Sequence, residues 1–158
     1  MYSEYFDSPI GRYRVVCDDR AVVSVQHTVG GRDSHPNDLT HRCVEQLREY
    51  FEGERTSFDL PIQFQGGTHF QKRVWGELLR IPYGETRSYK QVAASLGTQG
   101  YRAVGVACGR NPIEIIVPCH RVVGLNSLGG YSAGLEVKLY LLKLEARRSG
   151  RTEHILKL

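Results

Sequence analysis

The residues best suited to chemistry are two neighbours in the sequence, Cys119 and His120, which follow the mostly apolar run 113–117 after a single proline, Pro118. A thiol becomes a strong nucleophile when a neighbour lowers its pKa or accepts its proton, and an imidazole can do either. A single Cys-His pair is weak evidence by itself, because a buried cysteine is most often a small hydrophobic side chain. The pair therefore indicates a nucleophilic site only in combination with other motifs.

The composition is that of a globular chain of 158 residues, 41% hydrophobic and 24% charged. This length is enough for one good core or two small ones. No apolar run reaches the length of a membrane span, and the first residues lack the regions of a signal peptide, so we expect a cytoplasmic protein (nuclear in a eukaryote) with reduced cysteines. The cysteines show no CxxC spacing, and we expect neither a metal nor a cofactor, with a structural zinc as the alternative.

Charge is distributed unevenly along the chain. Residues 1–67 carry 7 Lys/Arg and 11 Asp/Glu (net −4), whereas residues 68–158 carry 14 and 6 (net +8), which together give the overall +4. A basic half predicts a polyanionic partner. A solvated basic surface without a ligand is the alternative on charge alone.

The first half reads as a small sheet with one helix. Strand-like runs cover residues 2–6, 12–16 and 21–26, with a turn at Ser8-Pro9-Ile10-Gly11 between the first two. Apolar residues then repeat at helical spacing over 39–51, behind Asn37 or Asp38 as the cap. The polar stretch 63–67 is a candidate linker. We predict an α+β protein: an N-terminal α/β structural domain with antiparallel sheet and linker (1–67), and a mostly helical C-terminal domain (68–158).

The second half contains clear helix starts. Thr68 and Ser88 are each followed three residues later by glutamine, which is the pattern of a capping box. The second of these helices (89–96) ends at Gly97, and Thr98 is expected to cap a third (about 99–109). Two short helices joined so tightly predict a helix-turn-helix, a motif whose second helix enters a groove of DNA. A helical hairpin that binds nothing is the alternative.

The span 70–145 resembles the C-terminal domain of O6-alkylguanine-DNA alkyltransferases, which are methylated-DNA–protein-cysteine methyltransferases. The residues that carry the resemblance are Ile81-Pro82-Tyr83-Gly84-Glu85, Ser88-Tyr89, Arg102-Ala103-Val104-Gly105, Asn111-Pro112, Ile116 through Val123, Gly130-Tyr131-Ser132, Gly134-Leu135 and Glu145. The first half resembles the family's N-terminal domain through Ser8-Pro9-Ile10-Gly11 and Tyr50-Phe51-Glu52-Gly53. The resemblance implies stoichiometric, irreversible transfer of the alkyl group from O6-alkylguanine (and O4-alkylthymine) in double-stranded DNA to the protein's own cysteine, by a monomer.

The resemblance also implies catalytic roles for the matching residues. Cys119 would attack the alkyl carbon, and His120 would be its base, through a bridging water because neighbouring side chains diverge. Glu145 would accept the other imidazole proton and hold the tautomer. Asn111, which precedes a proline, would brace the turn before the cysteine segment, and Tyr89 would donate its hydroxyl to guanine N3.

Further residues would hold the DNA and the damaged base. Arg102 would fill the space left by a nucleotide that is turned out of the duplex. The helix that carries it would lie in the minor groove, where the small residues Ala103, Gly105 and Ala107 allow close approach. Tight packing between helices is the alternative reason for small residues at this spacing. The remaining DNA contacts are expected from Tyr101, Lys90, Arg110 and Arg121, with a structural brace as the alternative for Arg121. The base pocket is expected to be formed by Tyr89, Val122, Tyr131, Ser132 and the loop Gly129-Gly130.

Three other functions fit parts of the sequence. A lesion-binding relative that flags alkylguanine without repairing it is disfavoured, because such relatives lack the reactive cysteine that Cys119 provides. An unrelated cysteine hydrolase would turn over. A helix-turn-helix regulator would prefer one DNA sequence over another.

Overall fold

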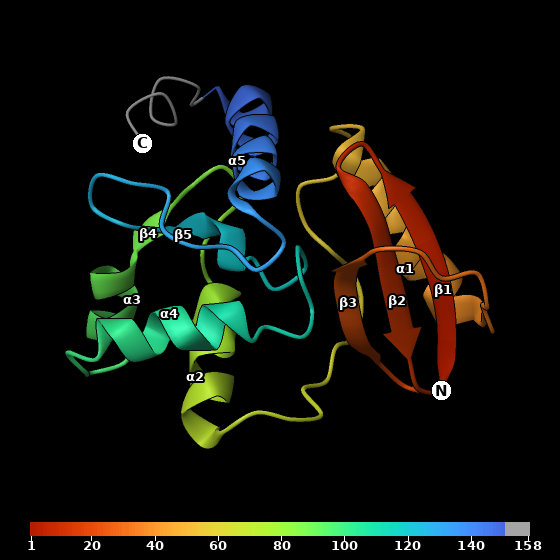
Figure 1. Ribbon diagram of the computed structural model, residues 1–158, viewed down its shortest axis with the longest axis horizontal. Coiled ribbons are helices and arrows are strands. Elements are labelled where there is room, and N and C mark those ends of the chain that lie inside the picture. The colour runs from red at the N-terminus through yellow and green to blue at the C-terminus, as the bar shows by residue number, and fades with distance from the viewer. Residues whose placement is uncertain (151–158) are drawn as a thin grey trace. The chain divides into compact units, whose positions relative to one another are not determined.

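The chain forms two units in the computed structural model, which describes residues 1–150 (Figure 1). The first unit contains residues 1–65 together with the later segment 112–116, and the second contains residues 66–111 and the chain from 117 onward. The predicted α+β class is confirmed. Segment 112–116 lies far into the predicted C-terminal domain by sequence, but its contacts belong to the first unit. The last eight residues of that predicted domain lie outside the described residues.

The first unit is a three-stranded antiparallel sheet with one helix. Its strands β1 (Tyr2–Ser8), β2 (Gly11–Cys17) and β3 (Val22–Thr28) are ordered β1-β2-β3. Helix α1 (Asp38–Phe51) packs against β1 and β2. The three predicted strands and the helix are therefore present, and each strand extends two residues or less beyond its predicted end. The first turn is tight because Ser8 pairs with Gly11 and its hydroxyl accepts a hydrogen bond from the amide of Ile10.

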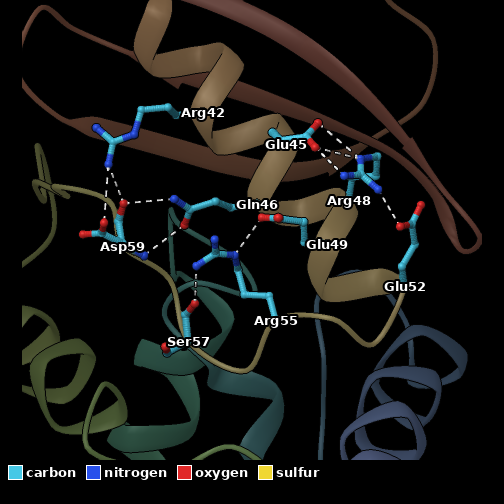
Figure 2. A network of polar contacts seen from close by, with 9 residues as sticks. All are labelled: Arg42, Glu45, Gln46, Arg48, Glu49, Glu52, Arg55, Ser57 and Asp59. Carbon is cyan, nitrogen blue, oxygen red and sulfur yellow. Dashed lines mark hydrogen bonds and ion pairs between the residues drawn. The ribbon is translucent and has the colours of Figure 1, made fainter.

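Polar contacts attach the loop after α1 to the helix (Figure 2). Of the two candidate caps, Asn37 is the one that accepts the amide of Thr40. The buried side chain of Gln46 makes two hydrogen bonds with the backbone of Asp59, at 2.9 and 3.1 Å. The ion pairs of Arg48 with the glutamates nearby are exposed, and exposed pairs contribute only about 0–1 kcal/mol each. These Arg48 pairs lie within α1 and its C-cap, so the loop is attached instead by Gln46, by Arg42, whose Nη2 donates to the carbonyl of Asp59 at 2.7 Å, and by Arg55, which pairs with Glu49.

Segment 112–116 extends the edge of the first sheet. The amide of Val25 donates to the carbonyl of Pro112, and the amide of Glu114 donates to the carbonyl of Val25. Glu114 also accepts the amide of His27, while burial raises the pKa of its carboxyl. Ile115 has a positive φ of 72°, a conformation that a β-branched residue adopts only at an energetic cost. The surrounding contacts over-determine the path of this segment.

The second unit contains the helices α2 (His69–Leu78), α3 (Tyr89–Ser95), α4 (Tyr101–Gly109) and α5 (Leu135–Ser149). The predicted capping boxes at Thr68 and Ser88 are both present. Helices α3 and α4 pack together and are joined by a short turn, as expected for a helix-turn-helix. The predicted cap of α4 is wrong, because Gly100 is the N-cap and the Thr98 hydroxyl instead accepts the amide of Gly100 within the turn.

A short parallel ladder connects the helix-turn-helix to the cysteine. Strand β4 (Arg87–Ser88) pairs with β5 (Val122–Val123), so that Ser88 lies opposite Val123. Tyr89 follows β4 directly as the first residue of α3. The 3-10 helix η1 (Cys119–Arg121) ends where β5 begins. Tyr89 and η1 therefore adjoin the two strands of one hydrogen-bonded ladder, which brings Tyr89 close to the turn that carries Cys119.

Helix α4 and helix α5 are fixed by buried packing. The indole Nε1 of Trp75 in α2 donates to the carbonyl of Ala107 in α4 at 2.8 Å. Both residues are almost fully buried. Leu142 and Ala146 of α5 pack with Val123 of β5. The first contact joins α4 to α2, and the second joins α5 to the ladder.

Candidate functional site

The cysteine thiol lies at the start of η1, directly after Pro118, and its residue is only 3% exposed. The amide of Cys119 donates to the carbonyl of Val117 at 2.9 Å, which gives the chain a sharp turn at this point. The side-chain amide of Asn111 donates to the same carbonyl at 2.8 Å. Asn111 thus connects the end of α4 to the segment that presents the thiol.

A buried carboxylate gathers the polar groups next to the cysteine. Oε2 of Glu145, in α5, lies 2.6 Å from Nε2 of His120. Both side chains are almost fully buried, at 0% and 1% exposure. Arg121 donates from Nε to Oε1 at 2.8 Å and from Nη2 to Oε2 at 3.1 Å. The amide of Gly84 also donates to Oε1, at 3.2 Å. One carboxylate therefore accepts hydrogen bonds from three residues that lie in two segments of the chain, η1 and the loop at Gly84.

This arrangement determines the protonation states. Although burial opposes the charged form, the imidazole and guanidinium beside Glu145 hold the pKa of its carboxyl well below the usual range. Burial lowers the pKa of His120, so the ring is neutral at pH 7. An ionised carboxylate beside a neutral ring requires the proton on Nε2, which leaves Nδ1 as the basic nitrogen. Among residues 1–150, buried Nδ1 has no hydrogen-bond partner.

Arg121 differs from the expectation of a DNA contact. Its side chain is 9% exposed, its Nη1 donates to the carbonyl of Ile81 at 2.7 Å, and its guanidinium lies over the ring of Tyr83. With Glu145 as its second partner, the guanidinium is turned inward and cannot bind a phosphate. The alternative of a structural brace is the one that fits. Sequence alone could not decide, because an arginine after a histidine looks the same in either role.

A pocket of about 470 Å³ opens beside the thiol. Helices α3 and α4, the cysteine turn and the glycine loop all contribute to its lining. Of the residues predicted for the site, Tyr89, Arg102, Tyr101, Cys119, Gly130 and Tyr131 line this pocket, together with Gly105, Val106, Cys108 and Gly109. The hydroxyl of Tyr89 accepts the amide of Gly130 at 3.2 Å. Gly129 has a positive φ of 73°, and a Cβ there would collide with that hydroxyl, so only glycine fits.

Other predicted residues lie around this pocket. Lys90 lies over the ring of Tyr101, and the two line a second pocket of about 370 Å³ on the helix-turn-helix. Ala103 and Arg110 are exposed at the start and end of α4, where DNA could reach them. Val122 is buried in β5, and the exposed Ser132 is not among the lining residues.

Ala107 was expected to allow close approach of α4 to DNA, and this expectation is wrong. The residue is fully buried, and its carbonyl accepts the Trp75 indole. Its small side chain serves the packing of α4 on α2. Gly105 faces Tyr89, where a Cβ would still find ordinary van der Waals contact.

Lys138 was not predicted, although it is fully buried beside the pocket. Its ammonium donates to the carbonyls of Val122 and Gly130 and lies 5.8 Å from the ring centre of Tyr89. The one sequence signal for its burial is helical periodicity, because Val137, Leu141 and Leu142 lie on the same, buried side of α5. A lysine in that pattern reads as a solvated side chain.

The other three cysteines are poor candidates for the nucleophile. Burial raises the pKa of the Cys17 thiol and of the Cys108 thiol to about 12, and that of Cys43 further still. Only Cys119 has an imidazole as its direct neighbour. Within residues 1–150, no group of three or more His, Cys, Asp or Glu side chains is placed to hold a metal ion. No helix in the same range is long and apolar enough to cross a membrane.

A thiol beside a neutral histidine, reached through a pocket that a helix-turn-helix lines, defines a DNA-binding protein that carries a nucleophilic cysteine. Comparison with known families gives the same class. Residues 69–147 match the DNA binding domain of 6-O-methylguanine DNA methyltransferase, and residues 1–64 match its ribonuclease-like domain. The chain therefore belongs to the 6-O-methylguanine DNA methyltransferase family.

Individual relatives agree over nearly the full length. A methylated-DNA–protein-cysteine methyltransferase of Methanosarcina barkeri is 44% identical over 154 residues, which cover 92% of this chain and 97% of the relative. The Mycobacterium tuberculosis O6-methylguanine methyltransferase crystal structure is 42% identical, covers 93% of each chain and has a TM-score of 0.84. A structure of the Mycobacterium tuberculosis protein in complex with DNA is 40% identical over 99% of each chain, with a TM-score of 0.85.

Proposed function

We propose that this protein repairs double-stranded DNA by moving the alkyl group of O6-alkylguanine to Cys119. The observation that carries the proposal is the placement of a nearly buried thiol beside a neutral imidazole, at the wall of a pocket on the DNA-binding domain. A pocket of about 470 Å³ is large enough for a purine with its alkyl group. O4-alkylthymine, which presents an alkyl group on a similar oxygen, is a second substrate. We also propose that the protein acts as a monomer, since the residues assigned to the site all come from one chain.

The nucleophile is activated by proton transfer to His120. Nδ1 of the ring takes the thiol proton through a bridging water, and Nε2–H stays on Glu145, whose negative charge stabilises the imidazolium that forms. Sγ then attacks the alkyl carbon. The new C–S bond forms as the C–O6 bond breaks, and the bonding pair moves onto the guanine. The protein is left with a thioether.

Tyr89 assists the departure of the guanine. Its ring lines the pocket, and its hydroxyl is held at the glycine loop by the amide of Gly130. That amide occupies an oxygen lone pair and leaves the O–H proton available for donation to N3 of the base. Burial raises the pKa of the Tyr89 hydroxyl, which keeps the proton on the oxygen at physiological pH. Guanine then leaves as a neutral molecule.

Reaction in a duplex requires the base to leave the stack, because a thiol that is 3% exposed cannot reach into DNA. Arg102 lies at the exposed start of α4 and lines the mouth of the pocket. We propose that its side chain fills the position that the base vacates. Lys90 and Arg110 add exposed positive charge along the same helix pair, which suits contacts with phosphates of any sequence.

The first test is stoichiometry. Titration with excess O6-alkylguanine DNA should produce a plateau at one alkyl group per chain, because a thioether has no good leaving group and water cannot regenerate the thiol. Intact mass and peptide mapping should place the added group on Cys119. The alkylated protein should also melt at a lower temperature, since extra atoms in a packed site cost about 1–3 kcal/mol. Product beyond one equivalent would instead indicate a turnover enzyme.

Replacement of Arg102 by alanine should distinguish the step that turns the base out of the duplex from the alkyl-transfer step. We expect the rate of repair of duplex DNA to fall by at least about tenfold, since unstacking a base costs a few kcal/mol that the inserted side chain offsets. The reaction with free benzylguanine should stay within about twofold, because a free base needs no extrusion. Arg80→Ala, at an exposed arginine outside the pocket, is the matched control. Equal losses on both substrates would assign Arg102 a structural role.

A further inference from the structure

A second pocket, of about 370 Å³, opens on the helix-turn-helix beside the pocket that contains Cys119. Its lining comes from α3, from the turn and from the start of α4, two helices that pack together (Figure 1). The lining residues are Lys90, Ala93, Ala94, Thr98, Gln99 and Tyr101. Tyr101 lines both pockets, so the two adjoin at this residue. The proposed alkyl transfer uses only the first pocket.

The walls of the second pocket combine a positive charge with an aromatic ring. Nζ of Lys90 lies 5.2 Å from the centre of the Tyr101 ring, and both side chains are exposed. Within residues 1–150, no carboxylate forms an ion pair with Lys90. The charge of the lysine is therefore available to an anionic ligand, while the ring offers a surface to a planar one.

The rest of the lining leaves space and holds the ring in place. Ala93 and Ala94 have small side chains, which keep the pocket open along α3. The Thr98 hydroxyl accepts the amide of Gly100 at 3.1 Å, and the amide of Tyr101 donates to the carbonyl of Gln99 at 2.9 Å. The backbone that carries the ring is thus fixed before any ligand binds, which reduces the entropic cost of binding.

A nucleotide supplies both groups that these walls fit. Lysine binds phosphate as a point charge, and aromatic side chains stack on bases with little regard to sequence. A free anion or an acidic peptide would use the lysine but not the ring. Because a single phosphate joins neighbouring nucleotides and the two pockets meet at Tyr101, a strand with its alkylguanine in the first pocket brings the next nucleotide to the second.

We propose that the second pocket is a subsite for the nucleotide next to the alkylguanine in the same strand, with Lys90 on its phosphate and the Tyr101 ring stacked on its base. The inference deepens the proposed function and rests on it. Arg102 acts only where a base must be turned out of a duplex, whereas this subsite also holds a single strand. The protein should therefore prefer an alkylguanine within a single strand to the isolated alkylguanine nucleoside.

The experiment compares O6-benzyl-2′-deoxyguanosine with a single-stranded trinucleotide that has the same nucleoside at its centre. The readout is the ratio of the two second-order rate constants of alkylation, from intact mass, so that a change in the first pocket itself cancels. Wild-type protein should react at least about tenfold faster with the trinucleotide, because stacking of one base contributes that much. Tyr101→Ala should lose most of this preference, and Tyr101→Phe, which keeps the ring, should retain it.

The role of the lysine is tested through its charge. Lys90→Met should lower the ratio, and the salt dependence of the trinucleotide reaction should become less steep by about 0.7 in log rate against log salt, the value for one phosphate of a single strand. Lys90→Arg should behave as wild type. The matched controls are Lys143→Met, at an exposed lysine of α5, and Tyr5→Ala in the first unit, where Arg12 lies 5.5 Å from the tyrosine ring. Both controls should keep the wild-type ratio.

A trinucleotide with abasic sites in place of its two outer bases separates the two contacts, since it keeps the phosphates and lacks the rings. Wild-type protein should react with it about tenfold more slowly than with the complete trinucleotide. Tyr101→Ala should show no such difference, whereas Lys90→Met should show it in full. This substrate tests the stacking even if Tyr101→Ala does not fold, because the change is made in the DNA.

Several results would overturn the inference. A wild-type ratio near one contradicts it, as does an unchanged ratio in Tyr101→Ala. An equal loss of Tyr101→Ala on the complete and the abasic trinucleotide would show that the ring contacts no base. If wild-type protein gains no alkyl group from any substrate, the proposed function fails, and fluorescence anisotropy of a labelled short single strand decides this inference instead. Tyr101→Ala should then bind the strand about tenfold less tightly than wild type, and equal affinities would refute the subsite.

Discussion

Replacement of Cys119 by alanine should abolish alkyl transfer while leaving the fold and DNA binding intact. The methyl group of alanine fills most of the space of the thiol but offers no electron pair for the displacement. No other cysteine can substitute, because burial raises the pKa values of Cys17, Cys43 and Cys108 and none of them has an imidazole neighbour. The measurement is the amount of protein that gains mass during incubation with O6-alkylguanine DNA.

Two controls make this result specific. Cys119→Ala should bind a duplex with wild-type affinity by fluorescence anisotropy, since the pocket walls and the helix-turn-helix are unchanged. Cys119→Ser keeps the polar volume and should also fail, because a serine hydroxyl beside a single imidazole is a far weaker nucleophile toward alkyl carbon than a thiolate. An alkyl group found on another cysteine of the alanine variant would refute the assignment.

Replacement of Glu145 by alanine should cause the largest loss of stability. The change leaves the Arg121 guanidinium buried opposite a neutral cavity and removes the acceptor of His120 Nε2. Removing one partner of a buried ion pair typically costs about 3–5 kcal/mol. Urea unfolding should show this loss, and alkylation by free benzylguanine should slow as well. Glu136→Ala, at an exposed glutamate of the same helix, should cost less than about 1 kcal/mol.

The same pair of residues sets the response to acid. Because the pKa of Glu145 is lowered in the folded state, its contribution is fully present above the ordinary carboxyl pKa of about 4.3 and is lost as pH falls toward the folded value. His120 has a lowered pKa from burial, so below about pH 6.5 the unfolded chain binds a proton that the folded chain does not. Stability should therefore decline in two stages, and an unchanged midpoint of unfolding between pH 7 and pH 4 would contradict these protonation states.

The sequence predicts the fold well where local signals are strong. Three alternating strands, the helix after Asn37 and the capping boxes at Thr68 and Ser88 each depend on residues close together in the chain. The cap of α4 could not be predicted, because Thr98 and Gly100 both fit a helix start and only the turn geometry decides. The place of 112–116 in the first unit depends on pairing with β3, some ninety residues earlier.

The residues of the site follow the same rule: those identified by nearby residues could be predicted, and those that depend on distant partners could not. The nucleophile and its histidine are neighbours in sequence and carry a recognisable motif. Arg121 and Lys138 have side chains that suit a surface equally well, so their burial depends on partners that only the folded chain brings near, namely Glu145 for one and the backbone carbonyls at the pocket for the other. From residue type alone, both side chains are expected to be exposed to solvent. Contacts with residues far away in the sequence bury both side chains instead.

The shared carboxylate of Glu145 has a consequence for how this protein could evolve or be engineered. Because one side chain orients the base of the nucleophile and also neutralises a buried arginine, a substitution there changes reactivity and folding together. Selection for a faster thiol therefore has little freedom at this position. The lining residues Val106 and Tyr101 take part in no such network and are partly exposed. A library aimed at new leaving groups would yield more folded variants at these two positions than around the histidine.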